Sequence, residues 1–154
     1  VMTQGDVIVM PDGEALRMTN VKDGFALQLA VRMGYNVAVI SGGYAKSMEE
    51  RMKALGVKGV FLHVPNKVLK FDEYMKEHDL KKEEVVYMGD DLPDYPIMQK
   101  VGLPVCPSDA AEEIKAVACY VSPRAGGEGC VRDVLEQVLR AQGRWMANAE
   151  AFGW

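Results

Sequence analysis

Several features of specialised proteins are scarce or missing in this sequence of 154 residues. Its three cysteines, Cys106, Cys119 and Cys130, are an odd number at wide spacing, which predicts buried thiols and argues against a disulfide framework or a zinc site. Two histidines, His63 and His78, are too few to favour a histidine-rich metal site. We find no signal-peptide pattern and no apolar run long enough to cross a bilayer, so we expect a soluble cytosolic protein.

Basic stretches are also missing. The net charge is −4, from 22 acidic and 18 basic residues, and this balance argues against a nucleic-acid partner. Internal repeats, low-complexity segments and interdomain linkers are absent, and hydrophobic residues make up an ordinary 49%. We therefore expect one globular domain over residues 1–154, with neither nucleic acid nor membrane as a partner.

Apolar strands alternate with amphipathic helices from Val21 onward. Short apolar runs predict strands at residues 36–40, 59–62, 85–88, 103–106 and 119–121. Apolar residues at helical spacing predict helices at residues 23–33, where Asp23 is the expected cap, 46–55, from 67 onward, 93–100, 110–116 and 129–141. This order predicts an α/β, Rossmann-like parallel sheet flanked by helices, with its chemistry at the carboxyl ends of the strands.

The two ends of the chain differ from this pattern. Residues 6–20 form two extended runs around Pro11-Asp12-Gly13 and predict a β-hairpin. An isolated hairpin is only marginally stable, so its apolar side chains should pack on the main body or on another subunit. Residues 142–154 contain two tryptophans and are interpreted as a mobile arm.

Carboxylates gather directly after the strand predicted at residues 85–88. Gly89 ends that strand, and Asp90, Asp91 and Asp94 follow within five residues. Acids crowded at the end of a strand repel one another unless a cation lies nearby, and hard oxygen ligands suit Mg²⁺. The alternative is a polar loop whose aspartates cap the next helix. Taken alone, the acidic turn leaves both interpretations open.

Two further strand ends carry groups that can bind an anion. Ser41-Gly42-Gly43 offers a hydroxyl and backbone N–H groups, although such a sequence is also an ordinary turn. Lys67 begins a helix, where a cation is unfavourable unless an anion is nearby, although it could equally be a solvated surface lysine. A hydroxyl, a lysine and a carboxylate cluster at successive strand ends together predict a site for a phosphoryl group with Mg²⁺.

The order of these motifs distinguishes two families. Receiver domains of response regulators place their acid pair early and their lysine last, whereas this chain has Ser41, then Lys67, then Asp90-Asp91. That order resembles the haloacid dehalogenase superfamily. Within it, the chain is similar over residues 1–145 to the capless 3-deoxy-D-manno-octulosonate 8-phosphate phosphatases. The segments that carry the similarity are Asn20-Val21-Lys22-Asp23-Gly24, Ile40-Ser41-Gly42, Gly89-Asp90-Asp91-Leu92-Pro93-Asp94, Arg124-Ala125-Gly126-Gly127-Glu128-Gly129 and Ala141-Gln142-Gly143-Arg144-Trp145.

The resemblance implies a cytoplasmic hydrolase of lipopolysaccharide precursor synthesis, with roles for particular residues. Asp90 would bind Mg²⁺ directly, and Asp91 and Asp94 would support the metal from the second shell. Ser41 and the Gly42 N–H would hold phosphoryl oxygens, and Lys67 would neutralise phosphate and nucleophile. The substrate-binding set would add Lys22, Arg124 and Arg144. The family is tetrameric, which implies a role for the hairpin at the subunit interface and for Gly126-Gly127 as a hinge.

The nucleophile motif of this superfamily, Asp-x-Asp-Gly, does not occur in the 154 residues. In the family it ends the first, central strand and lies just before the residues that match Val1–Gly5. We therefore expect roughly ten to twenty residues upstream of Val1, a strand plus this motif. A phosphatase for the related nine-carbon sugar acid 9-phosphate and a non-catalytic binding module remain alternatives. Gly43 favours the eight-carbon substrate, because the nine-carbon relative carries an acidic residue at that position.

Overall fold

The computed structural model describes residues 1–11, 13 and 15–147. Its strands are β1 (Ile8–Val9), β2 (Ala15–Leu16), β3 (Ala38–Ile40), β4 (Gly59–Phe61), β5 (Val86–Met88), β6 (Leu103–Cys106) and β7 (Tyr120–Val121). Its helices are α1 (Val21–Arg32), α2 (Lys46–Ala54), α3 (Lys67–Glu77), α4 (Tyr95–Met98), α5 (Glu112–Val117) and α6 (Cys130–Ala141), with 3₁₀ turns η1 (Lys82–Glu84) and η2 (Leu92–Asp94). The predicted α/β order is confirmed. The predicted turn residue Asp12 and the arm beyond residue 147 lie outside the described residues.

The parallel strands form two sheets. β3 pairs with β4, and β5, β6 and β7 form a second sheet in that order. Within the described residues, β3 and β5 each have a strand partner on one side only.

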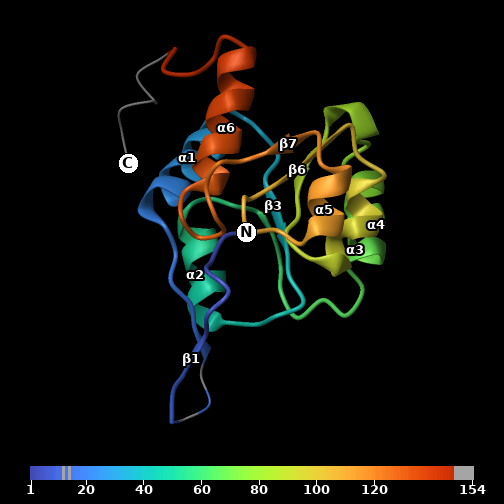
Figure 1. The fold of residues 1–154 in the computed structure, drawn as a ribbon. Helices are drawn as coiled ribbons and strands as arrows, with labels where there is room; N and C mark the ends of the chain where they lie inside the picture. The colour runs from blue at the N-terminus through green and yellow to red at the C-terminus, as the bar shows by residue number, and fades with distance from the viewer. Residues whose placement is uncertain (12, 14, 148–154) are drawn as a thin grey trace.

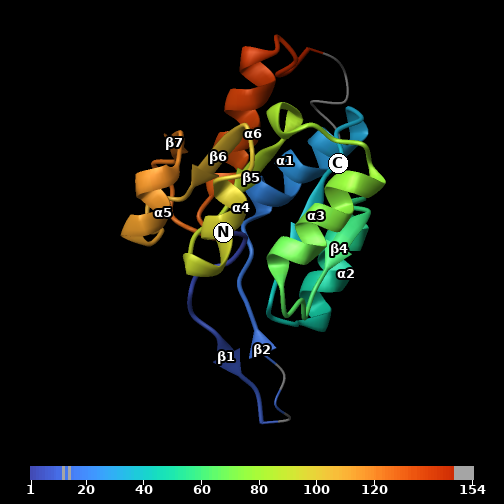
Figure 2. The ribbon, with the colours of Figure 1, turned by 90° about the vertical axis from the view of Figure 1, so that its right-hand side faces the viewer.

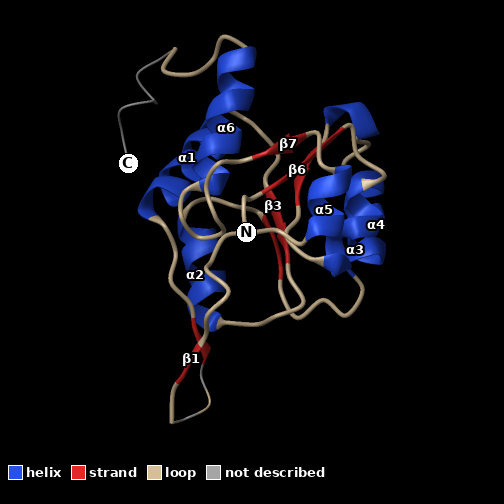
Figure 3. Cartoon of the chain, viewed as in Figure 1, coloured by secondary structure: helices blue, strands red, loops and turns tan. Residues whose placement is uncertain are grey.

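Helices cover both faces of the strands in a three-layer arrangement (Figures 1 and 3). Alternation along β3 sends neighbouring side chains to opposite layers. Val39 packs with α1, α2 and α6 around Leu27 and Met52. Ile40 packs with α3 and α4 around Phe71 and Ile97. The core is therefore divided between two faces, which explains why the strands are continuous apolar runs.

The predicted hairpin extends away from the helices and strands (Figure 2). β1 and β2 pair antiparallel, with Ile8 opposite Leu16 and Val9 opposite Ala15. Its apolar side chains do not pack on the main body, because Ile8 is 59% exposed and Val9 is 71% exposed. Of the two partners expected for these side chains, the main body is therefore excluded.

Two local predictions are wrong. α1 is capped by Asn20, whose side chain accepts a hydrogen bond from the Lys22 N–H at 2.8 Å, and Asp23 lies inside the first turn. Cys106 and Cys130 are buried as expected, but Cys119 is exposed because it precedes the short strand β7. Among the described residues, the helices are too short and too polar to span a membrane.

Candidate active site

The loops that carry the predicted site residues meet at one edge of the molecule. Ser41 follows β3, Lys67 opens α3 after β4, and Asp90 follows β5, all parallel strands. The carboxyl ends of parallel strands share an edge, so these side chains come from the two sheets toward a common region. An ion pair of 2.8 Å between Lys67, which follows β4, and Asp94, which follows β5, joins the segments that come after the two sheets.

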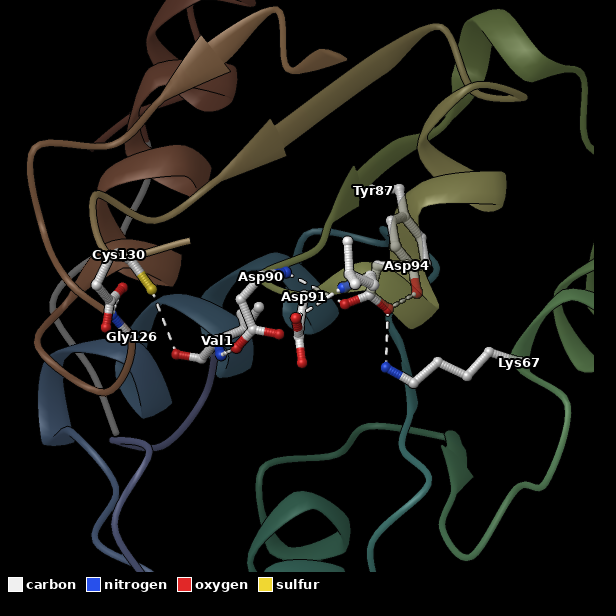
Figure 4. A network of polar contacts seen from close by, with 10 residues as sticks. Val1, Lys67, Tyr87, Asp90, Asp91, Asp94, Gly126 and Cys130 are labelled. Atoms are coloured by element: carbon white, nitrogen blue, oxygen red, sulfur yellow. Dashed lines mark hydrogen bonds and ion pairs between the residues drawn. The ribbon is translucent and has the colours of Figure 1, made fainter. Parts of the chain in front are cut away.

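Asp94 is the buried centre of this region (Figure 4). Its Oδ1 accepts hydrogen bonds from Lys67 Nζ and from the Tyr87 hydroxyl, each at 2.8 Å. Its Oδ2 accepts one from the Asp90 N–H at 3.1 Å. Burial alone would raise the pKa of Asp94, but the bond and charge of Lys67, then Tyr87 and the Asp90 N–H, hold it below the ordinary value. Asp94 is therefore ionised at neutral pH.

Asp90 belongs to the same loop and is only partly buried. Its carboxylate forms an ion pair with the amino group of Val1 (Figure 4). One carboxylate with waters and phosphate oxygens is a normal protein environment for Mg²⁺, so the donor at this position fits the predicted metal.

The three aspartates do not converge on one point. Asp91 accepts a hydrogen bond from the Leu92 N–H at 2.8 Å and caps η2, while Asp94 turns inward to Lys67. In the part of the chain that the structure describes, no group of three acidic, histidine or cysteine side chains could hold a metal ion. Asp94 is thus buried, Asp90 is partly exposed beside Val1, and Asp91 is exposed.

The loop after β3 is tied to the loop after β4. The Val64 N–H donates to the Ser41 carbonyl at 2.9 Å, and the His63 N–H donates to the Gly43 carbonyl at 3.1 Å. Ser41 Oγ accepts a hydrogen bond from the Gly43 N–H at 3.2 Å. Within the described residues, the Gly42 N–H has no hydrogen-bond partner. A hydroxyl and a free N–H therefore stand together, as an anion-binding turn requires.

Backbone atoms of the N-terminal residues pack against the predicted hinge. The Gly127 N–H donates to the Val1 carbonyl at 2.8 Å, and Cys130 Sγ approaches the same oxygen at 3.3 Å. A Cβ on Gly127 would lie 2.4 Å from the Gln4 nitrogen, and one on Gly126 would lie 3.2 Å from the Thr3 carbonyl oxygen. These glycines make room for the chain beside them, a role that the hinge interpretation did not include.

The predicted substrate-binding cations lie outside this network. Lys22 begins α1 and Arg124 follows β7, and both are exposed. Within the described residues, neither side chain forms a hydrogen bond or ion pair. Arg144 donates to the Met33 carbonyl at 2.8 Å and stacks over Tyr35, so it anchors the chain after α6 to α1.

Trp145, in the segment expected to be a mobile arm, packs against α6. Its ring lies under the guanidinium groups of Arg132 and Arg140, at 4.6 and 5.6 Å. Both arginines also bind Glu136. Trp145 is therefore part of the surface of α6 and fixes the beginning of the arm.

Two site residues were missed in the sequence. Tyr87 is one of the four residues of the apolar run that predicts a strand at residues 85–88, and a buried tyrosine normally needs a partner for its hydroxyl. Asp109, after β6, accepts a hydrogen bond from the Gly126 N–H at 2.8 Å and so fixes the glycine loop. The sequence gives no comparable signal for Asp109, because its partner is a backbone atom from a distant loop.

The sequence of this chain is similar to those of known proteins. A model for haloacid dehalogenase-like hydrolases matches residues 64–132. The 3-deoxy-D-manno-octulosonate 8-phosphate phosphatase of Escherichia coli strain K12 is 38% identical over 144 residues, which are 94% of this chain and 77% of that protein. The sequence similarity therefore covers nearly the whole chain.

Solved structures agree with the sequence comparison. The crystal structure of 3-deoxy-D-manno-octulosonate 8-phosphate phosphatase from Yersinia pestis superposes with a TM-score of 0.92 at 34% identity, covering 96% of this chain and 80% of that one. The enzyme from Moraxella catarrhalis, in complex with magnesium ion, phosphate ion and the sugar acid, has a TM-score of 0.91 at 28% identity and covers 96% and 84%. The fold is therefore shared over nearly the whole chain.

Proposed function

Because this chain belongs to the 3-deoxy-D-manno-octulosonate 8-phosphate phosphatase family of haloacid dehalogenase-like hydrolases, we infer that it hydrolyses that phosphate ester to the free sugar acid and phosphate. The observation that carries this conclusion is the arrangement of Lys67, Asp94 and Asp90 at the carboxyl edge of the strands. An ammonium, a buried carboxylate behind it and an open carboxylate beside it are suited to a phosphoryl group and a divalent metal.

Different residues of the site bind different parts of the substrate. Lys67 directs its ammonium to phosphoryl oxygens and offsets their negative charge. Ser41 and the Gly42 N–H hold the same oxygens from the loop after β3. Lys22 and Arg124 are the proposed partners of the sugar carboxylate, because both are exposed and neither side chain has a hydrogen-bond or ion-pair partner among the described residues. The substrate is thereby held at its phosphate and at its acid group.

The metal of this site is Mg²⁺, as in the Moraxella catarrhalis complex. When bound, Mg²⁺ neutralises phosphoryl charge and orients the ester for in-line attack. Asp90 would hold it directly, since its carboxylate is only partly buried and follows β5 at the carboxyl edge of the strands. Asp91 fixes the loop by capping η2, and Asp94 fixes the Asp90 backbone through the bond to its N–H.

The resemblance to the family assigns the attacking carboxylate to an Asp-x-Asp-Gly motif. This motif is not among residues 1–154. Two observations support a position for it beside Asp90. The first is that Val1 lies in contact with Asp90. The second is that β3 and β5 each have a strand partner on one side only within the described residues. A strand ending in this motif would bring a nucleophilic aspartate, which would form an aspartyl-phosphate, next to Asp90 and Lys67.

A homotetramer is the proposed assembly, with the hairpins at its centre. The support is the exposed apolar surface of the hairpin region, residues 6–20, which includes Ile8, Val9 and Met18. Exposed apolar patches of this kind mark interaction sites. Antiparallel edges of a hairpin can also pair with a second copy of the same hairpin.

Phosphate release by the natively expressed protein tests the function. The protein is incubated with Mg²⁺ and either the eight-carbon 8-phosphate or the nine-carbon 9-phosphate, and inorganic phosphate is measured. We expect kcat/KM to be higher for the eight-carbon ester, and we expect release to stop on chelation of the metal. No release from either ester would reject the enzymatic function and leave the fold as a binding module. Preference for the nine-carbon ester would reject the proposed substrate.

A further inference from the structure

The Tyr87 hydroxyl makes a contact that the proposed roles leave unexplained. It donates to Asp94 Oδ1 at 2.8 Å, and Lys67 Nζ donates to the same oxygen at 2.8 Å. The second oxygen of Asp94 accepts the Asp90 N–H at 3.1 Å. Figure 4 shows these groups converging on one carboxylate. Asp94 therefore joins strand β5, helix α3 and the loop that carries Asp90.

The surroundings leave Asp94 little freedom to turn. Its side chain is only 4% exposed. On one side, a Cβ on Gly89 would lie 2.6 Å from the Asp94 Cβ, so only glycine leaves room there. On the other side, the ring of Tyr87 packs edge-on against Phe71, with centroids 5.9 Å apart. Phe71 is one helical turn after Lys67, so this ring contact fixes the tyrosine relative to the helix that carries the lysine.

Loss of the hydroxyl would change the environment of Lys67. Asp94 Oδ1 would then face Lys67 alone, since Oδ2 is bonded to the Asp90 N–H. A carboxylate with fewer donors binds an ammonium more strongly, which would draw Nζ onto Asp94 and away from a phosphoryl oxygen. The carboxylate would also lose the contact that sets its direction from β5. The tyrosine hydroxyl thus donates a second hydrogen bond to Asp94 Oδ1 and fixes the direction of the carboxylate.

We propose that Tyr87 is a positioning residue, whose hydroxyl orients Asp94 so that Lys67 presents its ammonium to the phosphoryl group. The inference rests on the proposed function, because the position of Lys67 matters only if a phosphoryl group meets it. Tyr87 itself does not touch the substrate. Groups that support a reacting residue in this way commonly change activity by about tenfold or more when they are removed.

Two matched variants isolate the hydroxyl. Tyr87→Phe removes it and keeps the ring against Phe71. Tyr120→Phe is the control, because the Tyr120 hydroxyl also donates to an aspartate, Asp133, at 2.8 Å but lies between β7 and α6, outside the Lys67 network. Each variant of the native protein is measured for kcat and KM with Mg²⁺, for affinity for inorganic phosphate by calorimetry, and for Tm.

We expect Tyr87→Phe to lower kcat and the affinity for inorganic phosphate by about tenfold each. Tyr120→Phe should keep both within about twofold at a similar change in Tm. Wild-type kcat and phosphate affinity in Tyr87→Phe, or equal losses in Tyr120→Phe, would overturn the proposal. If the wild-type protein binds phosphate but releases none from the eight-carbon ester, the substrate is wrong, and the phosphate affinity of Tyr87→Phe still decides the role of Tyr87.

Discussion

Asp23, in the first turn of α1, accepts a hydrogen bond from the Arg132 backbone N–H at 2.7 Å. The Asp23 side chain therefore caps the N-terminal end of α6. The carboxylate is fully buried, and its Oδ2 has no hydrogen-bond partner in the described part of the chain. Burial raises the pKa of Asp23 above its ordinary value, although the N–H groups at the start of α6 partly offset this effect. An ionised Asp23 therefore reduces the stability of the folded state.

Asp23→Asn should remove this cost and keep the acceptor for Arg132. The pKa of Asp23 is higher in the folded state than the unfolded value of 3.8, so folding favours its protonated form. The stability of the wild type relative to the variant should be highest below pH 3.8 and fall as pH rises through the raised pKa. At pH 7 we expect the variant to be more stable by about 1 kcal/mol. Urea unfolding from pH 3.5 to 8 measures this difference, and a difference that grows in favour of the wild type with pH contradicts it.

Gly127→Ala should weaken the packing of the N-terminal residues. Gly127 has φ +71°, and a Cβ would lie 2.4 Å from the Gln4 nitrogen, so the variant combines backbone strain with a clash. We expect a loss of about 2–4 kcal/mol in unfolding free energy, measured by denaturant titration.

Gly143→Ala is the matched control for this variant. Gly143 has a similar φ of +65°, and nothing lies within 4 Å of the position a Cβ would take. The unfolding free energy of Gly143→Ala should fall by only about 1–2 kcal/mol, because this variant has the backbone strain without the clash. Equal losses in the two variants would show that the contact with Gln4 contributes nothing.

Lys67→Met should abolish most activity and also destabilise the fold. Lys67 is the cation that faces Asp94, so the variant leaves a buried carboxylate without its ion-pair partner. We expect kcat to fall about 10²–10³-fold and unfolding free energy to fall by about 3 kcal/mol. The double variant Lys67→Met/Asp94→Asn removes the unpaired charge, so it should regain stability without activity. A double variant that regains activity would exclude a direct role of Lys67.

Replacement of apolar residues in the hairpin should dissociate the assembly. Ile8→Ser/Val9→Ser removes two side chains that are mostly exposed in the single chain. We expect sedimentation to show loss of the tetramer, because the proposed interface loses its apolar area. Leu69→Ser, on α3, is a control of similar exposure, 61%, outside the hairpin and should leave the assembly unchanged. A hairpin variant that sediments like the wild type would contradict the proposed interface.

Much of the fold could be predicted because its elements follow local patterns. Apolar runs such as Ala38–Ile40 mark strands, and the spacing of Val131, Val134 and Leu135 marks α6. The wrong cap of α1 has a physical reason. Asn20 and Asp23 are both good capping residues, and the sequence does not show that Asp23 is needed by a different helix.

The candidate site could be predicted only in outline. Asp90, Asp91 and Asp94 are the same residue type in one turn, and local rules cannot tell which of them faces inward. Asp94 does so because Lys67 and Tyr87 reach it from 27 and 7 residues away. Such partners depend on tertiary packing, so the loop was predictable as a cluster of acids but not in the direction of each side chain.

Asp90→Asn tests directly whether this loop provides the metal-binding carboxylate of a sugar-acid phosphatase. Asn keeps the size of the side chain and removes the carboxylate charge that would attract Mg²⁺. In the native protein with Mg²⁺ and 3-deoxy-D-manno-octulosonate 8-phosphate, we predict at least about 10²-fold less phosphate release and weaker Mg²⁺ binding, with little change in Tm. Phosphate release at the wild-type rate from Asp90→Asn would contradict the account.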